Sequence, residues 1–111
     1  MTTIFTQDRF VTLINVFTVE PAQQRQLLDL LDQATAVVRL APGFISANLH
    51  RSLDGTKVAM YAKWQSFEHY QAMRENPAAL AYLQRAVEIA KFELGMYEVV
   101  ETYSAPDGSA Q

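Results

Sequence analysis

Residues 44–65 read FISANLHRSLDGTKVAMYAKWQ and decide the fold. The dipeptide Asp54-Gly55 best suits a two-residue type I′ turn, so the stretch predicts an antiparallel hairpin with strands over 44–53 and 56–65. If Leu53 pairs with Thr56, one apolar face of the hairpin holds four further pairs. They are Arg51 with Val58, Leu49 with Met60, Ala47 with Ala62, and Ile45 with Trp64.

The other face of this hairpin carries polar and aromatic side chains, among them Asn48, His50 and Tyr61. Such a mixture is too amphipathic for an ordinary core layer, so this face has to meet water or a partner. A two-fold dimer that stacks two copies of the sheet would cover it. We therefore expect a homodimer through Asn48, His50 and Tyr61.

The remaining segments predict the order β-α-β-β-α-β. Residues 11–19 read VTLINVFTV, with apolar residues at odd and even positions, as in a central strand buried on both faces. An amphipathic helix begins at Pro21 and stops at Pro42-Gly43. A second helix runs over 67–76, restarts at Pro77 and reaches Leu94-Gly95, and the last strand is 96–103. This order is the ferredoxin-like α+β fold, an antiparallel four-stranded sheet with both helices on one face.

The bulk composition bounds the class of protein. With 111 residues, half of them apolar, the chain suits a single domain over 1–111, with its core at about 9–103 and a flexible polar tail at 104–111. The net charge of −3 comes without any block of Lys or Arg, which argues against nucleic acid as a partner. No long apolar run and no signal-peptide pattern is present, so we expect a cytoplasmic protein with no membrane partner.

Several chemistries are excluded or disfavoured by the residues that are missing. The chain has no cysteine, which excludes disulfides, thiolate catalysis, cysteine zinc sites and iron–sulfur clusters. Its two histidines, His50 and His69, do not have metal-ligand spacing, so we expect no metal. No dinucleotide, phosphate-loop or serine-hydrolase motif occurs, and we expect no cofactor. A pocket for a small molecule is the candidate that remains.

That pocket is expected around Trp64, which projects toward the helices, where Tyr70 could meet it. The apolar candidates for substrate binding are Met60, Leu49, Ile45 and Met73. Two interpretations stay open. Large apolar side chains are normally plain core, or else Trp64 and Tyr70 border a flat aromatic cavity and offer it polar atoms.

Two further polar residues are candidates for the same pocket. Asn15 lies inside an otherwise apolar strand, so its amide must find either a neighbour or a ligand. Arg85, on the last helix, could place positive charge near a developing anion, or it could simply be exposed to solvent. His50 falls on the opposite face and is expected at the interface, although its intrinsic pKa would suit proton transfer.

Residues 42–70 resemble the antibiotic-biosynthesis monooxygenase family. The matching positions are Pro42-Gly43-Phe44, His50, Asp54-Gly55-Thr56, Tyr61-Ala62, Trp64 and Tyr70. The resemblance implies a dimeric α+β barrel that oxidises a phenolic polycyclic aromatic with dioxygen, from anthrone to quinone, without a metal or flavin. It also implies that Trp64 and Tyr70 are site residues.

The resemblance is incomplete at two positions. In the family an Asn stands four residues before the Trp, where this chain has Met60, and Arg85 lies slightly out of register with the helix Arg of the family. A thioether cannot polarise a carbonyl as an amide can. The resemblance to family members with an Asn on the first strand makes Asn15 a possible substitute. The haem-degrading branch needs a histidine within 76–84, and this chain has none there.

Three hypotheses follow. The first is a cofactor-independent monooxygenase in which Trp64, Tyr70, Asn15 and Arg85 act on the substrate. The second is a non-oxidative cyclase or isomerase of the same dimeric barrel, favoured by Met60. The third is a non-catalytic small-molecule-binding dimer, in which Trp64 and Tyr70 belong to an ordinary filled core.

Overall fold

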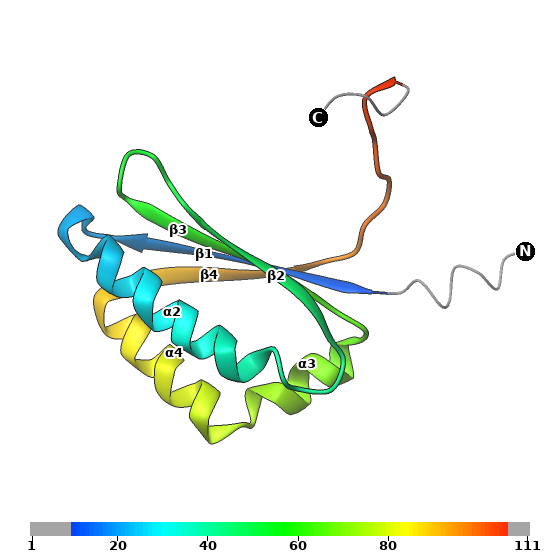
Figure 1. Cartoon of the computed structure of the whole chain (residues 1–111), viewed down its shortest axis with the longest axis horizontal. Helices are drawn as coiled ribbons and strands as arrows, with labels where there is room; N and C mark the ends of the chain where they lie inside the picture. The colour runs from blue at the N-terminus through cyan, green and yellow to red at the C-terminus, as the bar shows by residue number, and fades with distance from the viewer. Residues whose placement is uncertain (1–9, 107–111) are drawn as a thin grey trace, which may run out of the picture.

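A computed structural model describes residues 10–106, which form a four-stranded antiparallel sheet with the helices on one face (Figure 1). The strand order is β2-β3-β1-β4, which confirms the predicted ferredoxin-like fold. The strands are β1 Val11–Val19, β2 Phe44–Arg51, β3 Lys57–Trp64 and β4 Ala90–Tyr97. The helices are the 3-10 turn η1 Pro21–Gln23, α2 Gln24–Val38, α3 Phe67–Arg74 and α4 Pro77–Ile89.

Some expectations cannot be compared with this structure in full. The expected absence of a signal peptide concerns residues 1–9, and most of the predicted tail is 107–111; both lie outside the described residues. Between residues 10 and 106, no helix has the length and apolar character needed to cross a membrane. The single domain and the cytoplasmic location stay predictions.

Strand β1 is central, as predicted, because it pairs antiparallel with β3 on one side and β4 on the other along nearly its whole length. Its odd-numbered residues Leu13, Phe17 and Val19 are buried beneath the helices. Burial on the second face is only partial. Ile14 and Val16 point to the open face, where no helix or strand of residues 10–106 forms a second layer, and they are half-buried.

The hairpin turn is wider than predicted. The last paired residues are Ser52 and Lys57, whose backbones are joined by a 2.9 Å hydrogen bond, so the loop has four residues rather than two. Asp54 organises it by accepting hydrogen bonds from the Ser52 hydroxyl at 2.8 Å and from the backbone N–H and hydroxyl of Thr56 at 3.0 and 2.7 Å. These bonds lower the pKa of Asp54 to about 2, so the carboxylate stabilises the fold above pH 4 and loses that effect as the pH falls through 2.

The hairpin register is confirmed at three pairs and wrong at its far end. Arg51, Leu49 and Ala47 face the predicted partners on β3. A β-bulge then lies between Phe44 and Ser46, so Phe44, not Ile45, pairs with Trp64. Ile45 is the extra residue, and it is 39% exposed.

The end of the second helix and the last strand were predicted too late in the sequence. Helix α4 ends at Ile89, and the next residue, Ala90, is already extended, with φ −149° and ψ 150°. Strand β4 then pairs with β1 from Ala90 to Tyr97. The period-two alternation of Phe92, Leu94 and Met96 with polar residues belongs to this strand, and backbone pairing with β1 outweighs the helical propensity of the sequence around it.

Two glycines with positive φ offer a matched test of the packing between the hairpin and α3. Gly43 has φ 86° and Gly55 has φ 83°, but a Cβ on Gly43 would overlap both the Cβ and the imidazole of His69, whereas one on Gly55 would meet nothing closer than Pro21 Cβ at 3.5 Å. We expect Gly55→Ala to cost about 1–2 kcal/mol from φ alone. Gly43→Ala should cost roughly 1–3 kcal/mol more because of the overlap.

Chemical denaturation of both variants, of His69→Gly, and of Gly43→Ala combined with His69→Gly measures the difference. Relative to His69→Gly, which lacks the whole side chain with its Cβ, Gly43→Ala should cost only the part of the loss that comes from φ. Equal destabilisation by the two glycine substitutions would contradict the close approach of the strand to the helix.

Candidate active site

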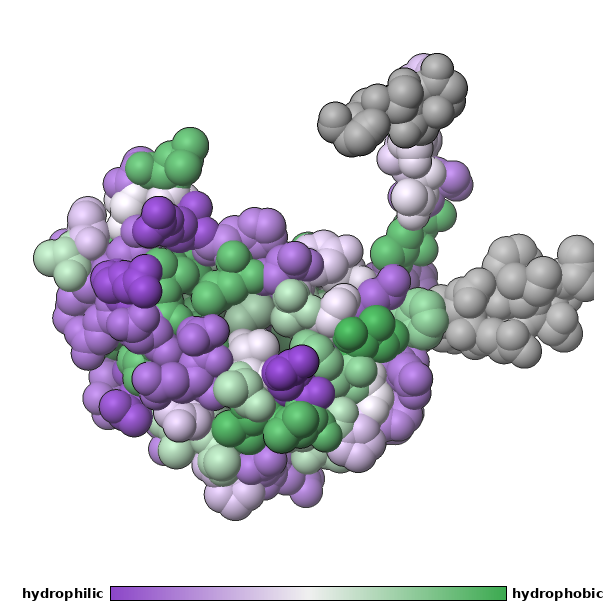
Figure 2. Space-filling model, viewed as in Figure 1, coloured by the Kyte–Doolittle hydropathy of each residue, from purple (hydrophilic) through white to green (hydrophobic). Residues whose placement is uncertain are grey.

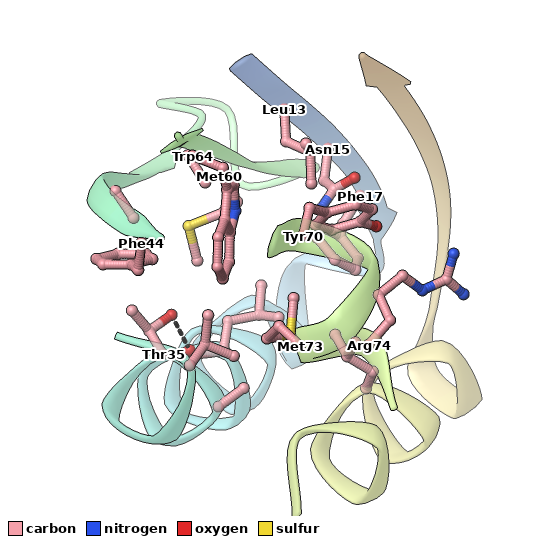
Figure 3. Close-up of a pocket in the computed structure, with 16 residues that line it drawn as sticks. Leu13, Asn15, Phe17, Thr35, Phe44, Met60, Trp64, Tyr70, Met73 and Arg74 are labelled. Carbon is pink, nitrogen blue, oxygen red and sulfur yellow. Dashed lines mark hydrogen bonds between the residues drawn. The ribbon is translucent and has the colours of Figure 1, made fainter. Parts of the chain in front are cut away.

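A cavity of about 90 Å³ lies between the helix-facing side of the sheet and the helices (Figure 3). Its wall is almost entirely apolar, and the space arises because the small side chains of Ala34, Ala47 and Ala62 stand beside bulky neighbours. The sixteen lining residues are Leu13, Asn15, Phe17, Leu31, Ala34, Thr35, Val38, Phe44, Ala47, Met60, Ala62, Trp64, Tyr70, Met73, Arg74 and Leu83. The region predicted around the tryptophan is therefore hollow rather than completely filled.

Trp64 forms an aromatic wall of the cavity. It is the last residue of β3, it is 1% exposed, and its ring lies edge-on to two other aromatic rings. The ring centroids are 5.4 Å from Phe44 and 6.0 Å from Tyr70, with interplanar angles of 86° and 68°. These T-shaped contacts hold the indole in one orientation, so the cavity has a rigid flat side.

Asn15 places an unsatisfied polar atom in this apolar cavity. It is an odd-numbered residue of β1 and therefore points toward the helices, directly across from Met60 of β3. Its Oδ1 atom is buried and has no hydrogen-bond partner among the described residues. Since a buried acceptor without a partner costs about 1–3 kcal/mol, the cavity is prepared to receive a hydrogen-bond donor.

Tyr70 is positioned by the start of α3. The Ser66 hydroxyl caps this helix, accepting from the His69 backbone N–H at 3.1 Å and lying 2.7 Å from His69 Nδ1. Tyr70 then falls on the inner side of the helix and is 6% exposed. Burial raises the pKa of its hydroxyl above the ordinary value of 10.0, and the charge of Arg74 opposes part of that shift. Tyr70 is thus protonated at neutral pH and can donate a hydrogen bond.

Arg74 lies one helical turn after Tyr70 and was not anticipated from the sequence. Its guanidinium carbon is 5.9 Å from the centroid of the Tyr70 ring, within cation–π range. In the view of Figure 3, Phe44 lies on one side of the indole, and Asn15, Tyr70 and Arg74 lie on the other. The i, i+4 spacing from Tyr70 was the signal that could have identified it.

The predicted site residues divide into two groups. Trp64, Tyr70, Asn15, Met60 and Met73 come from β1, β3 and α3, and the fold brings them together around the cavity. The other three are not part of the wall. Ile45 is displaced by the β-bulge, Leu49 packs beside the second core cluster around Phe17 and Leu27, and Arg85 is exposed.

Two lining residues have roles of their own. Phe44 replaces Ile45 at the wall, which the sequence could not show because nothing in it marks the bulge. Thr35 is polar, but its hydroxyl already donates to the Leu31 carbonyl at 2.8 Å. Within residues 10–106, no group of three or more His, Asp or Glu side chains is arranged to hold a metal ion.

The fold and the cavity define a ferredoxin-like α+β protein with an apolar space beneath its sheet, and comparison with known proteins gives its family. Residues 10–85 match the antibiotic biosynthesis monooxygenase family, to which the chain therefore belongs, as an enzyme of the monooxygenase type. It is 36% identical to the tetracenomycin-F1 monooxygenase of Streptomyces glaucescens, over 98% of this chain and 100% of that protein.

Solved structures share the fold at lower identity. SnoaB, a cofactor-independent oxygenase from Streptomyces nogalater, superposes with a TM-score of 0.75 at 23% identity, covering 85% of this chain and 96% of that chain. A protein of Mycobacterium tuberculosis superposes with a TM-score of 0.76 at 23% identity, covering 86% and 99%. At such identities the likeness concerns the fold alone.

The unsatisfied amide of Asn15 predicts a conflict between stability and binding. We expect Asn15→Leu to raise the free energy of unfolding by about 1 kcal/mol, because it removes a buried acceptor that the free protein leaves unpaired. Thr12→Val is the matched control for stability. Its Oγ1 is the other buried atom without a partner among the described residues, but Thr12 does not line the cavity.

Urea denaturation of both variants tests this expectation. Both should gain stability, and only Asn15→Leu should change ligand binding. A loss of stability in Asn15→Leu would mean that the amide is already satisfied in the free protein.

Proposed function

We propose that the protein oxidises a phenolic polycyclic aromatic with dioxygen, in a reaction of the anthrone-to-quinone type that uses no metal or organic cofactor. The observation that carries the proposal is the apolar cavity bordered by Trp64, into which the Asn15 amide offers an unpaired acceptor. The identity to a protein named tetracenomycin-F1 monooxygenase supports the same class of substrate.

The chemistry can proceed without a cofactor because the substrate supplies all the electrons. An anthrone-type ring carbon bears two hydrogens, and loss of one proton gives a carbanion that can pass an electron to dioxygen. Combination of the two radicals forms a carbon–oxygen bond, and loss of water leaves a carbonyl. The balance is CH₂ + O₂ → C=O + H₂O, so one oxygen atom enters the product. The task of the protein is to bind the ring in a dry slot and stabilise the anion.

Each wall of the cavity has a role in this proposal. Trp64 provides the flat surface, the protonated Tyr70 donates a hydrogen bond to a ring oxygen, and Asn15 accepts one from a phenolic hydroxyl. Because Asn15 and Met60 are paired across β1 and β3, an amide on either strand reaches the same part of the cavity. Asn15 can thus replace the amide that the family resemblance places at Met60.

A substrate of this size requires the cavity to widen. Its volume of about 90 Å³ is well below the roughly 300–1,000 Å³ typical of ligand sites. Met60 and Met73 are the lining residues best able to move, since an unbranched thioether changes rotamer at little cost. We therefore infer that both methionines turn aside when a planar ring enters.

Isotopic dioxygen distinguishes this proposal from the alternatives. With dithranol, a dihydroxyanthrone, as substrate and heat-denatured protein as the control for autoxidation, we expect turnover that stops without oxygen and a quinone that carries one ¹⁸O atom. Oxygen-independent conversion would instead indicate the cyclase or isomerase that Met60 favours. Binding without any conversion would indicate a non-catalytic binding protein.

The same assay tests the residues. We expect Asn15→Leu to lower kcat/KM roughly 10–100-fold, since the phenolic hydroxyl of the bound ring would lose its acceptor in an apolar cavity. Trp64→Phe should lower kcat/KM by a smaller factor, because the flat wall is reduced but not removed. Thr12→Val should leave kcat/KM unchanged, and an equal effect of Thr12→Val and Asn15→Leu would contradict the assignment.

We further propose that two copies associate through the open face of the sheet. Asn48 and His50 are exposed there, and Tyr61 is 38% exposed, next to the half-buried Ile14. The C-terminal segment adds apolar side chains to this face, because Val99 and Val100 are 55% and 88% exposed and border the same surface hollow as Ile14 and Tyr61. Figure 2 shows hydrophobic surface at the base of that segment, where it leaves the body of the molecule.

The interface is tested by a charge at its centre. We expect Tyr61→Glu to convert a dimer into a monomer in sedimentation velocity, since a carboxylate would be buried there without a partner. Leu40→Glu is the matched control, because Leu40 is 79% exposed on the helical side of the sheet and should leave the mass unchanged. A wild-type monomer, or a dimer that survives Tyr61→Glu, would refute this interface.

A further inference from the structure

We propose that Arg74 binds an anionic oxygen at the edge of the substrate, so that the site selects planar aromatic acids over their neutral analogues. The acid can be a carboxylate or an ionised phenol, which share this chemistry. The inference rests on the proposed function, because it concerns the same cavity. It adds the requirement that the bound substrate carry a negative charge, which neither the apolar wall nor the overall reaction demands.

The position of Arg74 marks where the cavity meets solvent. Of the sixteen lining residues within residues 10–106, Arg74 alone is charged and Arg74 alone is exposed; the other fifteen are buried or half-buried. A ligand that fills the cavity therefore reaches water beside this guanidinium. The buried part of the ligand meets apolar atoms, and its outer edge meets a positive charge.

Arg74 is also free to pair with a ligand. In the part of the chain that the structure describes, the one ion pair joins Arg25 Nε and Asp29 Oδ1 at 3.4 Å, so no carboxylate there occupies Arg74. Its described contacts are both with Tyr70: the guanidinium lies over the ring, and a side-chain hydrogen bond to the hydroxyl opposes the rise in the pKa of Tyr70. A guanidinium held over an aromatic ring keeps its N–H donors available along its edge.

The chemistry of this arrangement favours an oxygen anion. Arginine offers two parallel N–H donors that match a carboxylate, and it interacts with a single anionic oxygen through a shorter, charge-assisted hydrogen bond. The apolar wall beside it lowers the local dielectric and strengthens the attraction relative to open solvent. In the view of Figure 3, Asn15 and Tyr70 lie between the indole and the Arg74 guanidinium, so an acid held at Arg74 would extend past both residues toward Trp64.

The single tryptophan of the chain makes binding measurable without turnover. We propose titrations that follow quenching of Trp64 fluorescence by an anthraquinone carboxylate and by its methyl ester. The wild type should bind the acid about five- to tenfold more tightly than the ester, and added salt should reduce that ratio. Arg74→Gln should abolish the preference, and Arg74→Lys should keep part of it, because lysine supplies the charge without the planar fork.

The control variant is Arg39→Gln, which removes an exposed arginine at the end of α2 that does not line the cavity, and it should retain the preference.

A second arm uses a neutral hydroxyanthraquinone, titrated through its own pKa and followed by its visible absorbance. If the anionic form of this phenol gains affinity in the wild type but not in Arg74→Gln, the phenolate is a source of the anionic oxygen. A preference in the first arm alone identifies the carboxylate.

Failure of this inference can be told apart from failure of the proposed function. The role of Arg74 is overturned if the wild type binds the acid and its ester equally and the phenolate and the phenol equally, or if a preference for the anion survives Arg74→Gln. This holds even if dithranol is oxidised. An Arg74-dependent preference without oxygen-dependent turnover overturns the oxidation and leaves the anion site standing. If no compound quenches Trp64, the cavity binds no planar ligand and both are refuted.

Discussion

The register of β1 against β3 determines the whole cavity. In this register Val11 faces Trp64, Leu13 faces Ala62, and Asn15 faces Met60. All six residues point toward the helices or border the layer between sheet and helices. Because side chains alternate between the faces of a strand, a slip of one residue would move Asn15 to the open face and bring Ile14 into the cavity. The pairing of two central strands thus decides where Asn15, the one amide among the described residues that line the cavity, is placed, and with it the polarity of the site.

Hydrophobic pattern and turn residues in the sequence predict much of this framework. Strand β1 was placed at its observed bounds, and the face of Trp64, Met60 and Tyr70 was assigned to the helix side. The sequence could not reveal the bulge at Ile45, since an extra residue in one strand is fixed by how the partner strand and Gly43 are held in space. The late placement of the last strand has a different cause. Around residues 87–96 the apolar residues fit both the three- to four-residue spacing of a helix and the two-residue spacing of a strand, so the pattern does not mark where the helix ends.

The arginine of the site illustrates the same limit. Both Arg74 and Arg85 lie on helices, and the i, i+4 spacing of Arg74 from Tyr70 is the one sequence feature that favours the first. Helix α3 is short and starts at the Ser66 cap, which fixes its rotation so that Tyr70 and Met73 point inward and Arg74 stands at their outer edge. Arg85 lies on a longer helix whose inner side is occupied by Ala79 and Ala86, so it faces solvent. The orientation of each helix, which is a tertiary property, decides which charge reaches the cavity.

The cavity combines features that reduce stability with features that a planar ligand would compensate. An unpaired amide oxygen and an unfilled volume beside three alanines each make the free protein less stable than a filled apolar core would. A ring with a phenolic hydroxyl removes both defects at once, by filling the space and donating to Asn15. Binding then yields more free energy than contact area alone would suggest, because part of it comes from defects already present in the free protein. A neutral apolar ring would fill the volume but leave the amide oxygen unpaired, so the position of Asn15 favours ligands that carry a hydroxyl at the buried edge.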